Sequence, residues 1–116
     1  MPIVLLVDDD PEVLAVVRMT LEVEGHAVVS APSRAAAHKA MAKGGIDIVV
    51  TDSMLRGGNG DDVAKAAQRA GLPVIIVSGE PERVKRHEIG RIPFLAKPFH
   101  PSELAALITQ LLHSGN

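Results

Sequence analysis

Residues 46–54 read Ile46-Asp47-Ile48-Val49-Val50-Thr51-Asp52-Ser53-Met54, and this stretch decides the fold. Its β-branched and apolar residues predict a strand that is buried on both faces, as strands of parallel sheets usually are. The run ends abruptly in the carboxylate of Asp52. Because ligands of open parallel sheets bind beyond the carboxyl ends of the strands, we expect Asp52 at the mouth of a crevice.

Strand-like and helical patterns alternate along the rest of the chain. The apolar runs that predict strands cover residues 3–7, 26–30, 46–51, 73–77 and 92–96. Helical patterns cover residues 11–24, 33–43, 61–70, 81–88 and 101–113. This alternation is typical of a doubly wound α/β fold, in which helices cover both faces of a parallel sheet. Residues 81–88 are almost all charged, which predicts a short or degraded fourth helix.

The composition narrows the class of protein. The 116 residues predict a single domain, residues 1–116, and their 47% apolar content is enough for a core. The absence of cysteine excludes disulfides and thiolate metal sites. The net charge of −2 gives no general attraction to nucleic acid or to anionic membranes. Because neither a membrane-spanning run nor a signal peptide is visible, we expect a cytoplasmic protein.

Three acids follow the first predicted strand directly: Asp8, Asp9 and Asp10. If the strand that carries Asp52 is next to the first strand, Asp8, Asp9 and Asp52 share one crevice. Clustered carboxylates repel unless a cation lies between them, and an all-oxygen set of ligands suits Mg²⁺. Asp10 is expected to cap the helix that begins at Pro11. The alternative for the other two acids is that they too only form a helix cap.

Two further strand ends carry groups that suit an anion. The fourth predicted strand ends in Ser78-Gly79, a hydroxyl with space beside it, although such a pair is also a common turn. The fifth ends in Lys97-Pro98, and the lysine could pair with a phosphoryl oxygen or with Asp52. A cis bond before Pro98 would direct Lys97 into the crevice. The groups at the four strand ends together suit phosphoryl transfer to a carboxylate: an acid pair for a metal, a nucleophilic acid, a hydroxyl and a lysine.

The chain closely resembles the receiver domain of bacterial two-component response regulators of the chemotaxis-regulator type. The resemblance covers the whole chain and rests on Val4–Asp10 (VLLVDDD), Thr51–Leu55 (TDSML), Val77–Gly79 (VSG) and Lys97–Phe99 (KPF). It implies a flavodoxin-like (βα)5 fold with five parallel strands in the order 2-1-3-4-5. It also implies that the protein accepts a phosphoryl group from a sensor histidine kinase or a histidine phosphotransfer protein.

The resemblance assigns roles to individual residues. Asp52 is the expected phosphoacceptor, and Lys97 and Ser78 are expected to assist it. The expected Mg²⁺ ligands are Asp8, Asp9, Asp52 and the backbone carbonyl of Met54. The expected contacts of the phosphoryl group are Ser53, Ser78, Gly79 and Lys97. Phe94 corresponds to the aromatic switch position of the family and is expected to act together with Ser78, the alternative being a plain core residue.

The sequence also departs from the family pattern. Arg56 stands where proline is common, and the three glycines of residues 56–60 predict a mobile loop. His100 replaces the usual acidic cap before the last helix. The interval from Ser78 to Lys97 is shorter than usual. Relatives often dimerise through the fourth helix, fifth strand and last helix. Since the fourth helix is predicted to be short or degraded here, we expect a monomer or a weak dimer.

Two other functions fit parts of the sequence. A small phosphatase of the haloacid-dehalogenase type would use Asp8 and Asp10, but only Glu103 stands where an acidic pair should follow the lysine. Such a phosphatase would also leave Asp52 without a role. A binding module that never takes up phosphate would not need the complete set of site residues. We therefore expect no enzyme beyond one that catalyses its own phosphorylation and slow dephosphorylation.

The expected partners follow from the same observations. The basic residues of the fourth helical pattern predict a solvated surface rather than a nucleic-acid site, because the net charge is negative and no aromatic residue lies among them: Arg83, Lys85, Arg86 and Arg91. We thus expect no binding to nucleic acid by this domain itself, no membrane partner and an unknown downstream protein. Whether the receiver acts alone or as part of a larger regulator or hybrid kinase stays open.

Overall fold

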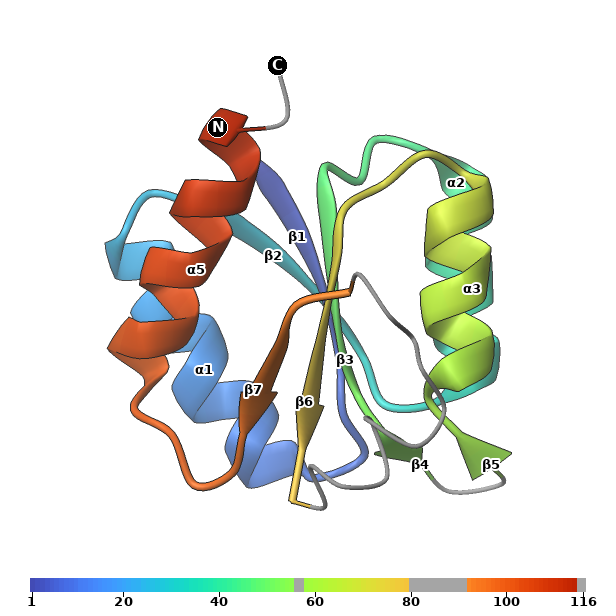
Figure 1. Ribbon diagram of the computed structural model, residues 1–116, viewed down its shortest axis with the longest axis horizontal. Helices are drawn as coiled ribbons and strands as arrows, with labels where there is room; N and C mark the ends of the chain where they lie inside the picture. Colours follow the sequence, from blue (N-terminus) through green and yellow to red (C-terminus); the bar gives the residue numbers. More distant parts are fainter. Residues whose placement is uncertain (56–57, 80–91, 115–116) are drawn as a thin grey trace.

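The computed structural model describes residues 1–55, 58–79 and 92–114, which form a five-stranded sheet with helices on both faces (Figure 1). The strands of the sheet are β1 (Ile3–Val7), β2 (Ala27–Ala31), β3 (Ile48–Asp52), β6 (Val74–Ser78) and β7 (Phe94–Ala96). The helices are α1 (Pro11–Val23), α2 (Arg34–Lys43), α3 (Asp61–Arg69) and α5 (Pro101–Ser114). A small hairpin consists of β4 (Met54–Leu55) and β5 (Gly58–Asn59).

The sheet has the order β2-β1-β3-β6-β7, and each pair of neighbouring strands is parallel. Numbered as the five predicted strands, this is the order 2-1-3-4-5, so the predicted doubly wound α/β fold is confirmed. The strand order reverses at β1, which lies between β2 and β3, and a ligand crevice is therefore expected beyond the carboxyl ends of β1 and β3. The predicted fourth helix over residues 81–88 and the loop residue Arg56 lie outside the described residues.

Two apolar layers hold the helices on the sheet. Helices α1 and α5 pack on one face and α2 and α3 on the other (Figure 1). All five residues of β3 are buried, with Val50 packed toward α1 and α5 and Val49 toward α2 and α3. This confirms the prediction that the strand is buried on both faces. Full burial of each such side chain stabilises the fold by roughly 1.5–3 kcal/mol, so Asp52 stands at the end of a rigid support.

Several predicted strand boundaries were wrong by one or two residues; the strand predicted over residues 92–96, for example, begins at Phe94. The strand predicted over residues 46–51 begins two residues later in the structure and includes Asp52. Just before this strand, the side chain of Asp47 accepts a hydrogen bond from the backbone N–H of Ile3 at 2.7 Å, and the N–H of Asp47 donates to the carbonyl of Ile3 at 2.8 Å.

Polar residues define the starts of two helices beside the crevice. Asp10 accepts a hydrogen bond from the N–H of Glu12 at 2.9 Å, which confirms that it caps α1. At α5 the N–H of His100 donates to Glu103 Oε1 at 3.1 Å, and the N–H of Glu103 donates back to the carbonyl of His100 at 2.9 Å. These two reciprocal hydrogen bonds stabilise the start of α5, although His100 stands where an acidic cap is usual.

The hairpin of β4 and β5 was not predicted from the glycine-rich sequence. Met54 pairs with Asn59 and Leu55 with Gly58 in an antiparallel register. Leu55 is buried in the layer beneath α2 and α3, and the N–H of Gly60 donates to the carbonyl of Ser53 at 2.9 Å. A hydrogen bond therefore joins the two ends of the segment that follows Asp52, and Leu55 anchors the segment in the core.

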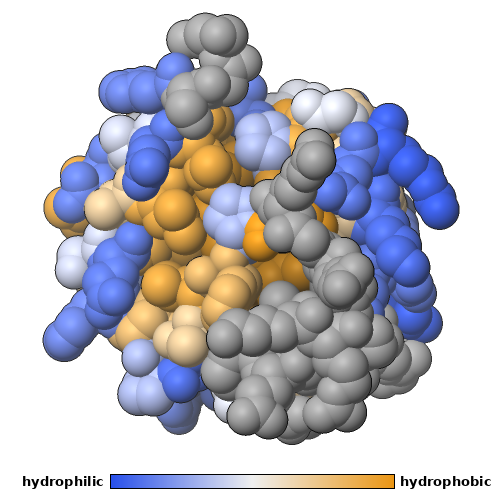
Figure 2. Space-filling view, in the orientation of Figure 1, coloured by the Kyte–Doolittle hydropathy of each residue, from blue (hydrophilic) through white to orange (hydrophobic). Residues whose placement is uncertain are grey.

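In the view of Figure 2, a largely apolar surface lies between α5 and β7, and hydrophilic residues border it on the outer side. In the described part of the chain, no helix combines the length and the apolar character that crossing a membrane requires.

Candidate functional site

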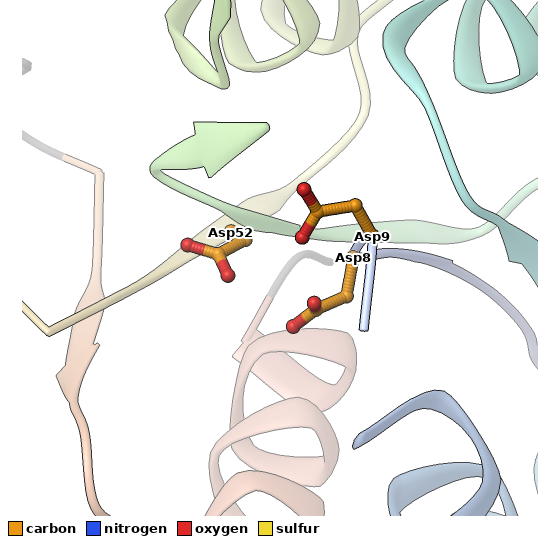
Figure 3. Close-up of side chains that lie close together, drawn as sticks. All are labelled: Asp8, Asp9 and Asp52. Carbon is orange, nitrogen blue, oxygen red and sulfur yellow. The ribbon is translucent and has the colours of Figure 1, made fainter. Parts of the chain in front are cut away.

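Three carboxylates meet at the carboxyl ends of β1 and β3 (Figure 3). Asp52 is the last residue of β3, while Asp8 and Asp9 come directly after β1. The two strands are adjacent and in register, with Val7 opposite Thr51. As a result, one oxygen from each of the three carboxylates lies within 4.8 Å of the others. The structure thus brings together the acids that the sequence predicted to share a crevice.

Hydrogen bonds hold two of these carboxylates in place. Asp52 Oδ1 accepts from the N–H of Met54 at 3.0 Å, and Asp52 Oδ2 accepts from Lys97 Nζ at 2.7 Å. Asp8 Oδ1 accepts from the N–H of Asp10 at 2.9 Å. Asp8 and Asp52 are only 4% and 8% exposed, so their charges are poorly solvated. Buried carboxylates in this arrangement require compensating positive charge.

Lys97 supplies part of this positive charge. Its Nζ lies 2.7 Å from Asp52 Oδ2 and 3.5 Å from Asp8 Oδ2, and its peptide bond to Pro98 is cis. Burial by itself would lower the pKa of Lys97, but the hydrogen bond to Asp52 and the negative charges of Asp52 and Asp8 outweigh it. The pKa of Lys97 is consequently raised, and the side chain is a cation at any physiological pH.

For Asp8, the nearby positive charge and hydrogen bond do not fully compensate for the effect of burial on its pKa. Burial raises the pKa of Asp8 and the charge of Asp52 adds to the rise, whereas the N–H of Asp10 and the charge of Lys97 lower it. The net effect is a raised pKa, which means that the charged form of Asp8 is disfavoured in the folded protein. A further cation at this position would reverse the effect.

The three clustered carboxylates are suited to binding a Mg²⁺ ion. Mg²⁺ prefers oxygen ligands at about 2.0–2.1 Å, which places neighbouring ligand oxygens roughly 3 Å apart. The carboxylate oxygens of Asp8, Asp9 and Asp52 already lie within 4.8 Å of one another, so small side-chain rotations suffice for shared coordination. No histidine or cysteine belongs to this cluster among the described residues, which favours a hard cation over zinc.

Replacing Asp8 with asparagine is expected to raise the thermal unfolding midpoint of the metal-free protein by a few degrees at neutral pH. Because the pKa of Asp8 is raised above 3.8 on folding, the native state binds this proton more tightly than the unfolded state. Stability therefore falls as the pH rises through the folded pKa, and the variant avoids this loss.

The same variant should lose most of the stabilisation that Mg²⁺ gives the wild type. Unfolding measured at several pH values with Mg²⁺ and with EDTA tests both effects, and a metal-free variant less stable than wild type at neutral pH would contradict them.

The serines at the ends of β3 and β6 lie against each other. Ser53 Oγ donates to Ser78 Oγ at 2.8 Å, and the two residues are 4% and 0% exposed. The N–H of Lys97 donates to the carbonyl of Ser78 at 2.8 Å, which links this serine to the lysine. A Cβ added at Gly79 would meet nothing within 4 Å, in agreement with the predicted space beside Ser78.

The remaining predicted residues, Phe94 and Met54, are partly exposed. Phe94 begins β7, the strand at one edge of the largely apolar surface of Figure 2, and it is 36% exposed. It is therefore not a plain core residue in this conformation. Met54 follows Asp52 by two residues and is 45% exposed, so an apolar side chain borders the acidic crevice.

Gly60 is a residue whose importance the sequence did not reveal. A Cβ at this position would lie 1.9 Å from the backbone carbonyl oxygen of Asp52. Only glycine permits this approach of the chain to the end of β3. The available signal was a glycine directly before α3, where a side-chain cap such as serine or aspartate is preferred.

The fold and the crevice together define a doubly wound α/β protein with an acidic, lysine-containing site at the reversal of its strand order. A family model described as the response regulator receiver domain matches residues 4–109. The chain belongs to this family, whose members are signalling modules of two-component systems rather than enzymes in the usual sense. This family is not that of the haloacid-dehalogenase phosphatases considered above.

Curated relatives place the domain among bacterial regulators. CpxR, a transcriptional regulatory protein of Escherichia coli (strain K12), is 35% identical over 97% of this chain and 50% of its own length. PhoB, the phosphate regulon transcriptional regulatory protein of Pseudomonas aeruginosa, is 27% identical over 94% of this chain and 51% of its own length. The chain thus spans about half the length of the curated relatives it matches.

Solved structures agree with the fold. The non-phosphorylated receiver domain of HemR from Leptospira biflexa has a TM-score of 0.83 at 28% identity, covering 97% of this chain and 94% of its own. TrrA from Thermotoga maritima, in complex with Mg²⁺-BeF, has a TM-score of 0.87 at 23% identity, covering 96% of this chain and 99% of its own. The likeness to TrrA supports the fold alone.

Proposed function

We propose that this chain is a phosphorylatable receiver domain that accepts a phosphoryl group on Asp52 and changes conformation in response. The observation that carries the proposal is the placement of Asp52 between a lysine and two further acids. Its carboxylate lies 2.7 Å from Lys97 Nζ, with oxygens of Asp8 and Asp9 within 4.8 Å. A carboxylate held in this way can attack phosphorus while cations neutralise the charge that the site takes up.

Asp8, Asp9, Asp52 and the backbone carbonyl of Met54 would hold the Mg²⁺ ion, which supplies charge neutralisation to phosphoryl oxygens when bound. The spacing of the three carboxylates supports this part of the proposal. The complex of TrrA, a protein of the same fold, with Mg²⁺-BeF supports it by analogy.

In the proposed transfer, an oxygen of Asp52 forms a new bond to phosphorus while the bond from phosphorus to a phosphohistidine nitrogen breaks. The electron pair of that bond returns to the imidazole of the donor, a sensor histidine kinase or a histidine phosphotransfer protein. Lys97 stays protonated and pairs with the transferred group, and Ser78, Gly79 and Ser53 line its place. No other covalent step is required of the protein.

The proposed conformational change links Ser78 to Phe94. Ser78 ends β6 and pairs in register with Ala96 of β7, the strand on which Phe94 lies. We expect Ser78 to contact the phosphoryl oxygens and the partly exposed Phe94 to turn inward behind it. The size of the shift is limited by how much better those oxygens are bound in the switched state.

The test of the proposed function is phosphorylation by a small donor. Wild-type protein incubated with acetyl phosphate and Mg²⁺ should gain the mass of one phosphoryl group, and EDTA should prevent the gain. Borohydride reduction, which converts an aspartyl phosphate into homoserine, followed by peptide mass analysis should place the modification at position 52. The proposal fails if the wild type remains unmodified or if the modification maps to another residue.

Met54 is expected to prolong the phosphorylated state. Its apolar side chain borders the crevice and is 45% exposed, and it cannot orient a water molecule for attack on phosphorus. Met54→Asn should therefore shorten the lifetime of the aspartyl phosphate several-fold. The lifetime is measured as loss of phosphoryl mass after the donor is removed, with Met54→Leu as the apolar control. A lifetime in the asparagine variant equal to or longer than that of wild type would refute the role.

The wider setting belongs to the same proposal. We propose that residues 1–116 form one receiver domain that acts in the cytoplasm as a monomer or weak dimer. The named relatives are transcriptional regulators about twice as long, so a nucleic-acid interaction is not assigned to this domain itself. The downstream partner is a protein that distinguishes the phosphorylated from the unphosphorylated surface.

A further inference from the structure

A buried hydroxyl group bonds to the backbone of Asp52. Thr51 precedes Asp52 in β3 and is 0% exposed, and its Oγ1 donates to the carbonyl oxygen of Asp52 at 3.1 Å. The direction of this bond is fixed, because a carbonyl oxygen carries no hydrogen and can only accept. Since bulk water does not reach the bond, it is stronger than the same bond would be at the surface.

Packing alone does not call for a hydroxyl at this position. Thr51 follows Val49 by two residues in β3, so both side chains lie on the face of the sheet that α2 and α3 cover. That layer is built from apolar side chains such as Val63, and valine has nearly the same shape as threonine. Burial of a hydroxyl costs free energy unless the group is hydrogen-bonded, and the carbonyl of Asp52 supplies that bond. The use of the hydroxyl is therefore to be sought in the backbone group that it holds.

A second part of the chain approaches the same carbonyl oxygen. A Cβ at Gly60 would lie 1.9 Å from this oxygen and 3.1 Å from Thr51 Oγ1. The hydroxyl, the carbonyl and the backbone just before α3 thus meet at one point, where no further side-chain atom fits. This crowding limits the directions in which the carbonyl of Asp52 can turn.

The peptide group between Asp52 and Ser53 is held through both of its polar atoms. Its carbonyl accepts from Thr51 at 3.1 Å, and its N–H, which belongs to Ser53, donates to the carbonyl of Val77 at 2.8 Å. Because a peptide group is planar, fixing both atoms fixes its tilt. The tilt sets the direction in which the chain continues to Met54, whose N–H donates to Asp52 Oδ1 at 3.0 Å.

We propose that Thr51 is a positioning residue, which holds the peptide group after Asp52 so that the Asp52 carboxylate and the backbone of Met54 keep the geometry that the phosphorylated state requires. This inference rests on the proposed function. Thr51 acts through the backbone of Asp52 and touches neither the phosphoryl group nor the metal ion. Small movements matter at such a site, because a misplacement of about 1 Å can cost roughly a hundredfold in rate.

The test compares two substitutions of Thr51. The affinity for beryllium fluoride, a stable substitute for the phosphoryl group, is measured by calorimetry in saturating Mg²⁺. Thr51→Val keeps the shape but removes the hydroxyl, and it should bind about two- to tenfold more weakly than wild type. Thr51→Ser keeps the hydroxyl and should bind more tightly than Thr51→Val. Equal affinities of Thr51→Val and wild type, or equal losses in both variants, would overturn the inference.

A merely structural role predicts a different result. If the hydroxyl served stability alone, Thr51→Val would lower the unfolding midpoint and leave the affinity of the folded protein for beryllium fluoride unchanged. The positioning role predicts weaker binding at a temperature at which thermal unfolding shows both proteins to be fully folded.

A spectroscopic signature follows from the same geometry. The amide proton resonance of Met54 should move upfield in Thr51→Val, because its hydrogen bond to Asp52 Oδ1 becomes longer. The matched control is Thr109→Val, which removes a hydroxyl that donates to the carbonyl of Ala105 at 3.0 Å within α5 and should leave both the resonance and the affinity unchanged. A Met54 resonance that does not respond to Thr51→Val would contradict the role of Thr51.

The two levels of the proposal fail in different ways. If the wild type binds no beryllium fluoride in Mg²⁺, the proposed function fails and the role of Thr51 fails with it. If the wild type binds and Thr51→Val binds equally well, only the role of Thr51 fails.

Discussion

Asp52→Asn is expected to abolish phosphorylation by acetyl phosphate in Mg²⁺, with no gain of mass under conditions that modify the wild type fully. The asparagine amide has nearly the same volume, and its oxygen can still accept the N–H of Met54, which bonds Asp52 Oδ1 at 3.0 Å. It lacks the negative charge that pairs with Lys97 at 2.7 Å and the nucleophilic oxygen that phosphoryl transfer requires. The chemistry is thus removed while the packing is kept.

The matched control is Asp10→Asn. Asp10 belongs to the same acidic run but caps α1 through the N–H of Glu12, and asparagine caps helices equally well. This variant should be phosphorylated at the rate of the wild type. Equal modification of Asp52→Asn and wild type would show that another residue is the acceptor and would remove the basis of the proposed function.

Gly60→Ala is expected to cause the largest loss of stability of any single methyl addition near the site. The new Cβ would lie 1.9 Å from the carbonyl oxygen of Asp52, far inside any real contact distance, and that oxygen belongs to backbone at the end of β3. Relief requires α3 and the hairpin to move away from β3, which disrupts the buried layer containing Leu55 and Val63. We expect a loss of about 3 kcal/mol or more. Thermal unfolding followed by circular dichroism should show a midpoint lower by roughly 10 °C.

Gly79→Ala is the control for this prediction. Gly79 lies at the same edge of the sheet, but a Cβ there would meet nothing within 4 Å. Its unfolding midpoint should equal or slightly exceed that of wild type, because alanine reduces the freedom of the unfolded chain by about 0.4–1 kcal/mol. Similar losses in both variants would mean that crowding against Asp52 is not the cause.

Local sequence patterns predicted much of the fold. The apolar run before Asp52 predicted a strand buried on both faces, and all five residues of β3 are buried. The acid before Pro11 predicted a helix cap, and Asp10 forms it. These features depend on residues that are neighbours in the chain, for which strand and helix periodicity and capping rules are direct guides. The order of the strands came from the resemblance to receiver domains, not from periodicity.

Features that join distant parts of the chain were harder to foresee. The N–H of Ile3 donates a hydrogen bond to the side chain of Asp47, and the sequence pattern contains no sign of this contact. The glycines after Leu55 predicted a mobile loop, and the antiparallel pairing of Met54 with Asn59 and of Leu55 with Gly58 was not foreseen. The need for glycine at position 60 arises only when α3 and β3 are placed against each other.

By itself, the sequence determined the class of fold, the buried strand beneath the site and the kinds of groups at four strand ends. This was possible because the alternation of apolar residues and the residues that end each strand are encoded locally. The tertiary structure alone decided that Ser53 donates to Ser78 and that Gly60 touches the backbone of Asp52. Both contacts depend on the register between elements that lie apart in the chain, and a shift of one residue in a strand would turn each side chain to the opposite face.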